Sequence, residues 1–269
     1  MKKAEPHIIV QDLTAAYGSN VILHDLTFTI NRGDIFIIMG ASGGGKSTVL
    51  RSMVGLLPPV KGHILYDGLS FWSVGPEEQK SIMRRFGVLY QSGALWSSLT
   101  LAENVALPLQ LYTDLGQGQI NEIVSLKLSL VGLSGFEDYY PSEISGGMKK
   151  RAGLARAMTL DPEILFFDEP SAGLDPISAH LLDELIIELR DSLGATVVVV
   201  THELASIFAI ANNSVFLDAD TKTMIAAGDP RKLLAESKDP KVINFLTRGE
   251  GKQRRQGGGN QWIEVKSNE

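Results

Sequence analysis

The sequence DIFIIMGASGGGKST, residues 34–48, joins an apolar run to a glycine-rich loop. The apolar run, 34–40, has the length and composition of a buried strand. The loop GASGGGKST matches the pattern G-x-x-x-x-G-K-[ST], and the residues after it, KSTVLRSMVGLL, have the apolar spacing of a helix that stops before Pro58. A loop between a strand and a helix N-terminus binds phosphate through its backbone N–H groups. This order of elements therefore predicts a phosphate-binding site.

Each residue of the loop has a predicted part in holding a phosphate chain. We expect the loop N–H groups to surround a β-phosphate, Lys46 to neutralise β- and γ-phosphate oxygens, and Ser47 to bind Mg²⁺. Thr48 is a neighbouring hydroxyl in support. The whole loop comprises Gly40, Ala41, Ser42, Gly43, Gly44, Gly45, Lys46, Ser47 and Thr48. The alternative is a glycine-rich connector with an exposed lysine, which the flanking strand and helix disfavour.

A second segment, ILFFDEP (164–170), ends a predicted strand in two acids. Asp168 is placed to hold Mg²⁺ through water beside the phosphate loop. Glu169 is predicted to face the γ-phosphate, where a carboxylate can orient or deprotonate the attacking water. Taken alone, the pair could be two solvated acids at a strand end. Together with Lys46 and Ser47, they predict a hydrolytic site.

His202 and Gln91 are further candidates. His202 ends the strand-like run TVVVVTH (196–202), and Gln91 follows FGVLY. Parallel strands end at a common edge, so Gly40, Asp168 and His202 are expected together where such sheets bind ligands. His202 would contact the γ-phosphate, and the Gln91 amide would reach Mg²⁺ or the attacking water. Either residue alone could have only a structural hydrogen-bonding part.

The segment YPSEISGGMKKRAGLARAMTL (140–160) carries a second anion site. Ser145, Gly146 and Gly147 begin a helical pattern and lack an acidic or Mg²⁺ partner of their own. One chain thus holds one complete phosphate cradle and one cap without a site. Two copies arranged head to tail would place each cap over the nucleotide of the other, and the turn SAGLD (171–175) would cross such an interface. The alternative for Ser145 is an ordinary helix N-cap beside packing glycines.

Composition narrows the classes of function. The chain has 269 residues, is 44% hydrophobic and 21% charged, and carries a formal net charge of −6. The acidic balance argues against nucleic acid as the main partner. It has no cysteines, which excludes disulfides and thiolate metal sites. Without a signal-like segment or a membrane-length apolar run, we expect a soluble, cytoplasmic chain.

The order of the predicted elements indicates one nucleotide-binding domain over residues 7–247. Strand-like runs, 7–18 and 21–30, come first; a helical segment follows within about 92–160; strand–helix–strand alternation then implies a parallel sheet. A hairpin is predicted over 213–228, with short helices in 229–247. The polar, glycine-rich tail 248–269 is expected to be flexible.

Tyr17, GASGGGKST, Gln91, ISGGM (144–148), ILFFDEP, SAGLD and His202, in this order, resemble the nucleotide-binding subunit of ABC transporters. The resemblance implies an α/β P-loop NTPase with a RecA-like core of mainly parallel sheet, an N-terminal antiparallel β subdomain and an inserted α-helical subdomain. It also implies ATP and Mg²⁺ as cofactors, and a homodimer that closes on two ATP molecules and opens after their hydrolysis. Tyr17 would stack on the adenine, although tyrosines in strands are often core residues. The helical region would carry a groove for the coupling helices of a membrane permease.

The usual family signature is L-S-G-G-Q, and here Ile144 and Met148 replace its two ends. With SGGMKKRAGLARA, YQSGALWSSLTLAENVALPL and DPKVINFL, the chain looks like the ATPase of the Mla/MCE-type lipid transport systems. That likeness implies an integral Mla-type permease, an MCE-domain lipid carrier, a small STAS-domain protein, phospholipid cargo, and a place on the cytoplasmic face of the inner membrane. Alternatives are an importer or exporter ATPase for another small substrate, a soluble ABC ATPase outside transport, an ATP-gated clamp without catalysis, and a small-molecule P-loop kinase.

Overall fold

The central sheet consists of buried strands whose two faces pack against different layers. A computed structural model describes residues 5–249. Its six-stranded sheet has the order β10-β9-β3-β8-β7-β6, and all neighbours are parallel except β10 and β9. The strands are β3 Ile35–Gly40, β6 Phe86–Leu89, β7 Ile164–Asp168, β8 Thr196–Val200, β9 Asn213–Asp218 and β10 Thr223–Ala227. Parallel β3, β7 and β8 therefore end at one edge.

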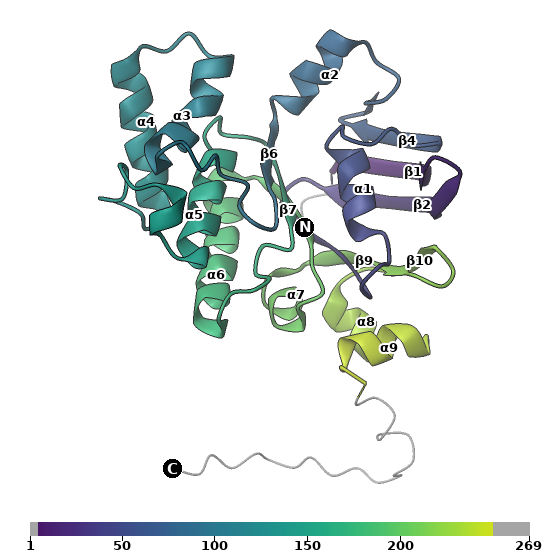
Figure 1. Ribbon diagram of the computed structural model, residues 1–269. Coiled ribbons are helices and arrows are strands. Elements are labelled where there is room, and N and C mark those ends of the chain that lie inside the picture. Colours follow the sequence, from purple (N-terminus) through teal and green to yellow (C-terminus); the bar gives the residue numbers. More distant parts are fainter. Residues whose placement is uncertain (1–4, 250–269) are drawn as a thin grey trace, which may run out of the picture.

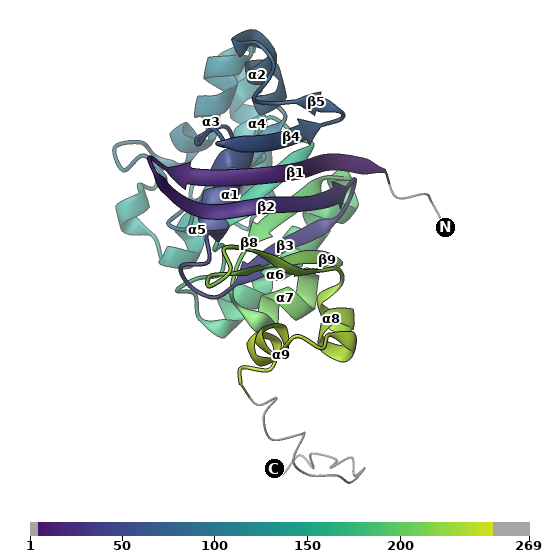
Figure 2. The same cartoon turned by 90° about the vertical axis from the view of Figure 1, so that its right-hand side faces the viewer.

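A second, antiparallel sheet lies in front of the first (Figure 2). Its order is β2-β1-β4-β5, from β1 Pro6–Tyr17, β2 Asn20–Asn31, β4 Lys61–Tyr66 and β5 Leu69–Ser70. Helix α1, Lys46–Met53, packs with Val49, Leu50 and Met53 in the apolar core shared by the two sheets. The helix that follows the phosphate-binding loop is thus held by both sheets.

Alternation along each central strand divides the protein into two apolar cores. On β3, Phe36 and Ile38 face the antiparallel sheet, while Ile35 and Ile37 face the helices on the other side. β7 and β8 alternate in the same way. Strands apolar on both faces are typical of parallel sheets covered on both sides. Packing in these two cores fixes the positions of the strand ends relative to one another.

Helices cover the second face and the ends of the sheet (Figure 1). They are α2 Pro76–Met83, α3 Leu101–Tyr112, α4 Gln117–Leu130, α5 Gly146–Ala157, α6 Pro176–Leu193, α7 Leu204–Ile210, α8 Pro230–Glu236 and α9 Pro240–Leu246, with a short 3₁₀ turn, Pro141–Glu143. Helix α3 begins with a capping box: Thr100 Oγ accepts from the Glu103 N–H at 3.2 Å, and Glu103 Oε2 accepts from the Thr100 N–H at 2.7 Å. No helix within residues 5–249 combines the length and apolar character needed to cross a bilayer.

The predicted fold class is confirmed: an antiparallel sheet comes first, a mainly parallel sheet forms the core, and α3, α4 and α5 fall within the helical segment predicted for 92–160. The boundaries 7–247 and 92–160 stay predictions, and residues 250–269 of the predicted tail lie outside the described part. The first helix was predicted too long. It ends at Met53 because Gly55 takes φ +85° and the Leu56 N–H turns back to the Arg51 carbonyl at 2.8 Å. The sequence patterns also missed α2 and the two-residue β5.

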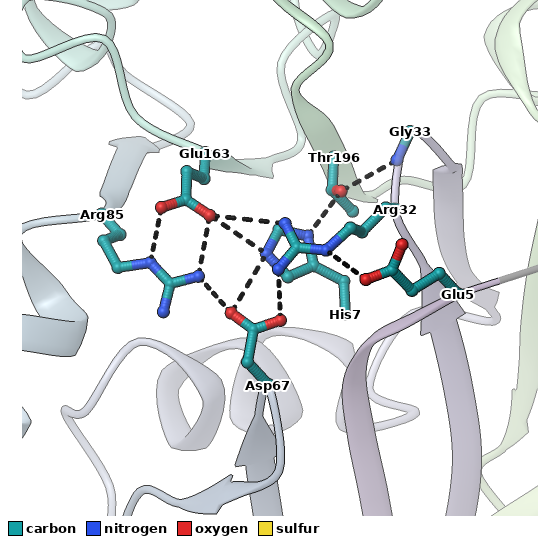
Figure 3. A network of polar contacts seen from close by, with 8 residues as sticks. All are labelled: Glu5, His7, Arg32, Gly33, Asp67, Arg85, Glu163 and Thr196. Atoms are coloured by element: carbon teal, nitrogen blue, oxygen red, sulfur yellow. Dashed lines mark hydrogen bonds and ion pairs between the residues drawn. The ribbon is translucent and has the colours of Figure 1, made fainter.

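A polar network fastens the antiparallel sheet to the central sheet at the edge opposite the strand ends described above (Figure 3). Arg85 joins two acids of the network: Nε donates to Glu163 Oε1 at 2.9 Å, and the terminal nitrogen donates to Glu163 Oε2 at 2.8 Å and to Asp67. Arg32 also donates to Asp67, which directly follows β4. The buried His7 ring lies behind these groups, with Nδ1 2.7 Å from Thr196 Oγ. Charged residues that flank β2, β4, β6 and β7 are thereby linked to one another.

One atom of each of His7, Asp67 and Glu163 lies within 4.8 Å of the others, a spacing that could suit a metal ion. Arg32 and Arg85, however, already donate to both carboxylates. A cation would have to displace guanidinium groups whose charge already pairs with these oxygens. We therefore assign the network a structural role.

The network predicts a specific pH dependence of stability. Burial lowers the pKa of His7, and the neighbouring Arg32 acts in the same direction. Between this lowered pKa and the unfolded value of 6.5, the unfolded chain binds more protons, so stability falls as pH falls through that window. His7→Gln should flatten this slope, which is at most about 1.4 kcal/mol per pH unit for one group. Urea unfolding at stepwise pH between about 7 and 5 measures it.

Exposed His63 provides the control, and His63→Gln should keep the wild-type slope. Glu163 titrates in a lower window, because the hydrogen bond from Arg85 lowers its pKa below 4.5. The same pH profile for His7→Gln and the wild type would show that His7 does not carry this linkage.

Candidate functional site

Close packing requires glycine at both ends of the segment that joins β3 to α1, at Gly40 and at Gly45. A Cβ on Gly40 would lie 2.3 Å from the Leu217 carbonyl oxygen of β9. Gly45, the residue before α1, has φ +80°, and a Cβ there would lie 2.5 Å from Leu23 Cδ1. Larger residues would push the loop away from both sheets. The glycines therefore hold the α1 N-terminus directly above the end of β3.

Lys46 is buried at the first position of α1. Its Nζ donates to the carbonyl oxygens of Gly40 and Ala41, each at 3.0 Å. Burial lowers its pKa, although Glu169 and Asp168 act in the opposite direction. A buried ammonium whose hydrogen bonds go to its own loop is suited to exchange those carbonyls for an anion.

Ser47 and Asp168 meet beside this lysine. Ser47 Oγ donates to Asp168 Oδ1 at 3.0 Å, joining α1 to the end of β7. Burial raises the pKa of Asp168, while the hydrogen bond from Ser47 acts the other way. A hydroxyl and a carboxylate are oxygen donors of the kind that Mg²⁺ prefers in nucleotide sites. The two side chains thus fit the predicted Mg²⁺ position.

Glu169 directly follows Asp168 and has an unusual backbone. Its φ is +50°, in the left-handed region that non-glycine residues seldom occupy. Oε1 lies 2.8 Å from His202 Nδ1, while Oε2 is buried without a hydrogen-bond partner. A carboxylate fixed on one oxygen and unpaired on the other can accept a proton from a bound water. The side chain of His202 is 54% exposed, so its ring can also reach a ligand.

Gln91 and Tyr17 lie at the borders of this region. β6 pairs with β7 through Leu89 and Phe167, which brings Gln91, two residues after Leu89, to the same sheet edge as Asp168. The exposed Gln91 side chain makes no hydrogen bond with Ser47 or Asp168. Tyr17 is exposed at the end of β1, and its hydroxyl accepts from Arg51 of α1 at 2.9 Å. Both roles stay predictions: Gln91 toward Mg²⁺ or water, Tyr17 toward the base.

The Ser145 cap belongs to another part of the molecule. Ser145 Oγ accepts from the Met148 N–H at 3.2 Å, and Ser145 and Gly146 are exposed at the start of α5. Gly147 packs near Ser178 of α6. Figure 1 places α5 and α1 on opposite sides of β7. Within one chain the cap and the cradle are therefore apart.

Two cations of α5 that the sequence patterns missed contact the loops of the site. Lys150 donates to the Pro170 carbonyl at 2.6 Å and also to the Ala172 carbonyl. Arg156 donates to the carbonyls of Ala94 and Gly93 at 2.8 and 3.1 Å. The sequence held one signal that Lys150 is buried: it lies four residues before the buried Leu154, on the same face of the helix. Nothing in the sequence indicates which carbonyls these cations reach.

Comparison with known proteins identifies the family of this chain. The ABC transporter family matches residues 23–172. The chain belongs to the ABC transporter family. A probable ribonucleotide transport ATP-binding protein, mkl, of Mycobacterium tuberculosis is 43% identical over 239 residues, which are 89% of this chain and 66% of that protein. The ABC chain thus spans about two thirds of the length of the mycobacterial relatives it matches.

Other relatives match over most of both chains. The intermembrane phospholipid transport system ATP-binding protein MlaF of Haemophilus influenzae is 42% identical over 239 residues, 89% of each chain. The structure of cbiO1 from Clostridium perfringens, part of an ABC transporter complex, has a TM-score of 0.79 at 25% identity and covers 93% of this chain and 99% of that one. A dimeric bacterial ABC transporter cassette has a TM-score of 0.76 at 27% identity, covering 82% and 98%. A dimeric cassette of the same kind has been solved in a post-hydrolysis state with ADP and phosphate.

The geometry of Glu169 in this ABC cassette predicts the effect of one substitution. Glu169→Gln keeps the size of the side chain but removes the basic oxygen that is now unpaired. ATP binding should be kept, while hydrolysis falls by roughly 10²–10⁴-fold, the usual effect of removing a general base. Equilibrium ATP binding and phosphate release measure the two quantities. Unchanged turnover would remove Glu169 from this role.

Proposed function

We propose that this chain is the ATP-hydrolysing subunit of an ABC transport complex that moves lipid. One observation carries the proposal: Lys46, Ser47, Asp168, Glu169 and His202 converge at one sheet edge, while the second anion-binding helix end lies elsewhere on the same chain. A complete cradle and a separate cap are the two parts of a nucleotide site shared between copies. The dimeric arrangement of the similar cassettes supports this geometry.

In the proposed mechanism, the loop N–H groups and Lys46 hold the β- and γ-phosphates of ATP. Ser47 and Asp168 would hold Mg²⁺, which neutralises the developing charge on the phosphate oxygens. Glu169 accepts the proton of the attacking water, and His202 keeps Oε1 in place and contacts the γ-phosphate. Gln91 would orient the water or help to hold Mg²⁺, and Tyr17 would stack on the adenine.

Ser145, Gly146 and Gly147 act on the nucleotide of the second copy. Backbone N–H groups and the Ser145 hydroxyl at the α5 N-terminus suit a γ-phosphate. Closing the dimer would bury each ATP between a cradle and a cap, and loss of the γ-phosphate would release the cap. Cycles of ATP binding and hydrolysis would thereby close and open the dimer.

A groove between α2, β6, α3 and α5 suits a membrane permease. It encloses a cavity of about 410 Å³ lined by Met83, Arg84, Phe86, Pro108, Tyr112 and Arg156, among others. Arg84 lies over the Tyr112 ring at 5.7 Å, and Tyr112 is 54% exposed. Because Arg156 also holds the loop after Gln91, a helix seated in the groove would act on the active site through Arg156 and this loop.

The proposed cargo is phospholipid, as in the name of the MlaF relatives. The complex would include a periplasmic lipid carrier with an MCE domain and a small STAS-domain protein, and this subunit would act on the cytoplasmic face of the inner membrane. The mycobacterial relatives carry the name of a ribonucleotide transport protein, so a nucleotide cargo is the competing outcome.

Mixed dimers test the shared site. Ser145→Arg and Lys46→Ala should each abolish most hydrolysis in homodimers, because both sites lose a required part. A dimer of one Ser145→Arg chain and one Lys46→Ala chain keeps one intact pair of cradle and cap. Phosphate release from purified mixed dimers should rise clearly above that of either homodimer, to at most about half the wild-type rate, because one active site of two is complete.

The control mixes Ser145→Arg chains with Glu169→Gln chains, which also leave one complete site with a functional base. If verified mixed dimers of both kinds stay inactive, the caps do not serve the opposite chain.

Purification of the tagged chain from membranes tests partner and cargo. A permease and enriched phospholipid should accompany the wild-type subunit, and Met83→Glu should reduce recovery of the permease by more than about tenfold, because a buried charge in the groove is costly. Leu126→Glu, on an exposed position of α4 outside the groove, is the matched control.

Equal recovery with Met83→Glu and Leu126→Glu would rule out this groove as the docking site. Enriched nucleotide without phospholipid would overturn the lipid assignment and leave the ATPase assignment intact.

A further inference from the structure

Lys150 is a buried cation without a carboxylate partner among the described residues. It is 6% exposed, and its Nζ donates to the carbonyl oxygens of Pro170 and Ala172. Burial lowers the pKa of Lys150, while the charge of Glu169 acts in the opposite direction. Burying an ammonium without an opposite charge costs free energy, and hydrogen bonds to carbonyl oxygens offset only part of that cost. Its contacts therefore point to a specific role in the loop after Glu169.

The loop that Lys150 holds determines the position of Glu169. The Glu169 backbone is in the left-handed region, its N–H donates to the Val200 carbonyl at 2.8 Å, and its carbonyl accepts from the Ala172 N–H at 3.2 Å. Pro170 has no N–H to donate, so the loop has few backbone bonds of its own. Lys150 supplies two further bonds to the backbone directly after Glu169.

The same helix starts at the Ser145 cap. Lys150 is the fifth residue of α5, so about 6 Å of helix axis separates it from Gly146. A helix this short moves as a rigid body. A displacement of the cap therefore shifts Lys150, and through its hydrogen bonds the backbone after Glu169.

We propose that Lys150 is a positioning residue that couples the two ATP sites of the dimer. This rests on the proposed function, in which Ser145 contacts the ATP of the partner while Glu169 acts on the ATP of its own chain. ATP bound in the second site seats the cap, and Lys150 then aligns Glu169 in the first. In each chain, Ser145 thus senses whether the partner's site holds ATP, and Lys150 passes this on to Glu169 of the same chain.

The test measures one site with the other filled or empty. The first chain is wild type or Lys150→Met, which has similar length but no donor. The second chain carries Glu169→Gln, so that its own site binds ATP without hydrolysis, or Lys46→Ala, so that its site stays empty. Both second chains keep Ser145, so the first site is complete, and the substitution in the second chain prevents turnover at the second site. Single-turnover formation of phosphate is measured in mixed dimers purified through two different tags.

With a wild-type first chain, the rate should be about 5–150-fold higher when the second site is filled, the usual range of coupling between sites. With Lys150→Met this ratio should fall to about one, while ATP affinity changes less than about twofold. Lys150→Arg, which keeps a cationic donor, should retain a ratio above about fivefold. Lys149→Met, on the next position of the same helix, should behave as wild type. If Lys150→Met does not fold, Lys150→Gln replaces it and should lower the ratio to less than half.

A lower rate with an unchanged ratio would show that Lys150 is only structural, and would overturn the coupling. A wild-type ratio of one would overturn it as well, although hydrolysis dependent on Ser145 of the partner would still support the proposed function. Absence of hydrolysis in wild-type dimers would instead contradict the proposed function itself.

Discussion

The buried ammonium of Lys46 is the feature on which the site depends. Its partners in the chain are the carbonyl oxygens of Gly40 and Ala41, while Asp168 and Glu169 lie close enough to affect its pKa. A charge in this position is stable because a glycine loop lets backbone oxygens approach closely. A triphosphate can take over those hydrogen bonds and add opposite charge. Binding of nucleotide thus completes an arrangement that the fold has already prepared.

The two apolar cores give this arrangement its rigidity. Central strands that are buried on both faces cannot slide by one residue without exchanging their cores. The ends of β3, β7 and β8 are therefore fixed relative to one another, and α1 is held between two sheets. At the opposite edge, the network around Arg85 keeps the antiparallel sheet in register with the central one. Residues that never approach nucleotide thus determine the separation of Lys46, Asp168 and Glu169.

The central strands, the phosphate loop and the two acids could be predicted from the sequence, because the patterns that indicate them are local. An apolar run followed by GASGGGKST is typical of a strand, a phosphate loop and a helix, and ILFFDE places two acids at a strand end. The contacts of Lys150, Arg156 and Arg85 could not be predicted, since each joins residues far apart in the chain through backbone oxygens or carboxylates. Helix α2 was missed because its eight residues contain one buried side chain and hence little apolar periodicity. The end of α1 depended on the left-handed Gly55, which the apolar pattern continuing to Leu57 concealed.

Helix α5 connects these parts. It begins at the Ser145 cap, holds the loop after Glu169 through Lys150, and holds the loop after Gln91 through Arg156, beside the groove proposed for the permease. In a dimer with exchanged caps, α5 would contact the ATP of the partner, the loop that follows Glu169 of its own site, and the permease.

The most direct measurement is the structure of the ATP-bound Glu169→Gln dimer. Ser145 Oγ and the α5 N–H groups of each chain should lie within hydrogen-bonding distance of the γ-phosphate held by the other chain. A dimer with ATP in both cradles and Ser145 far from either triphosphate would contradict this prediction.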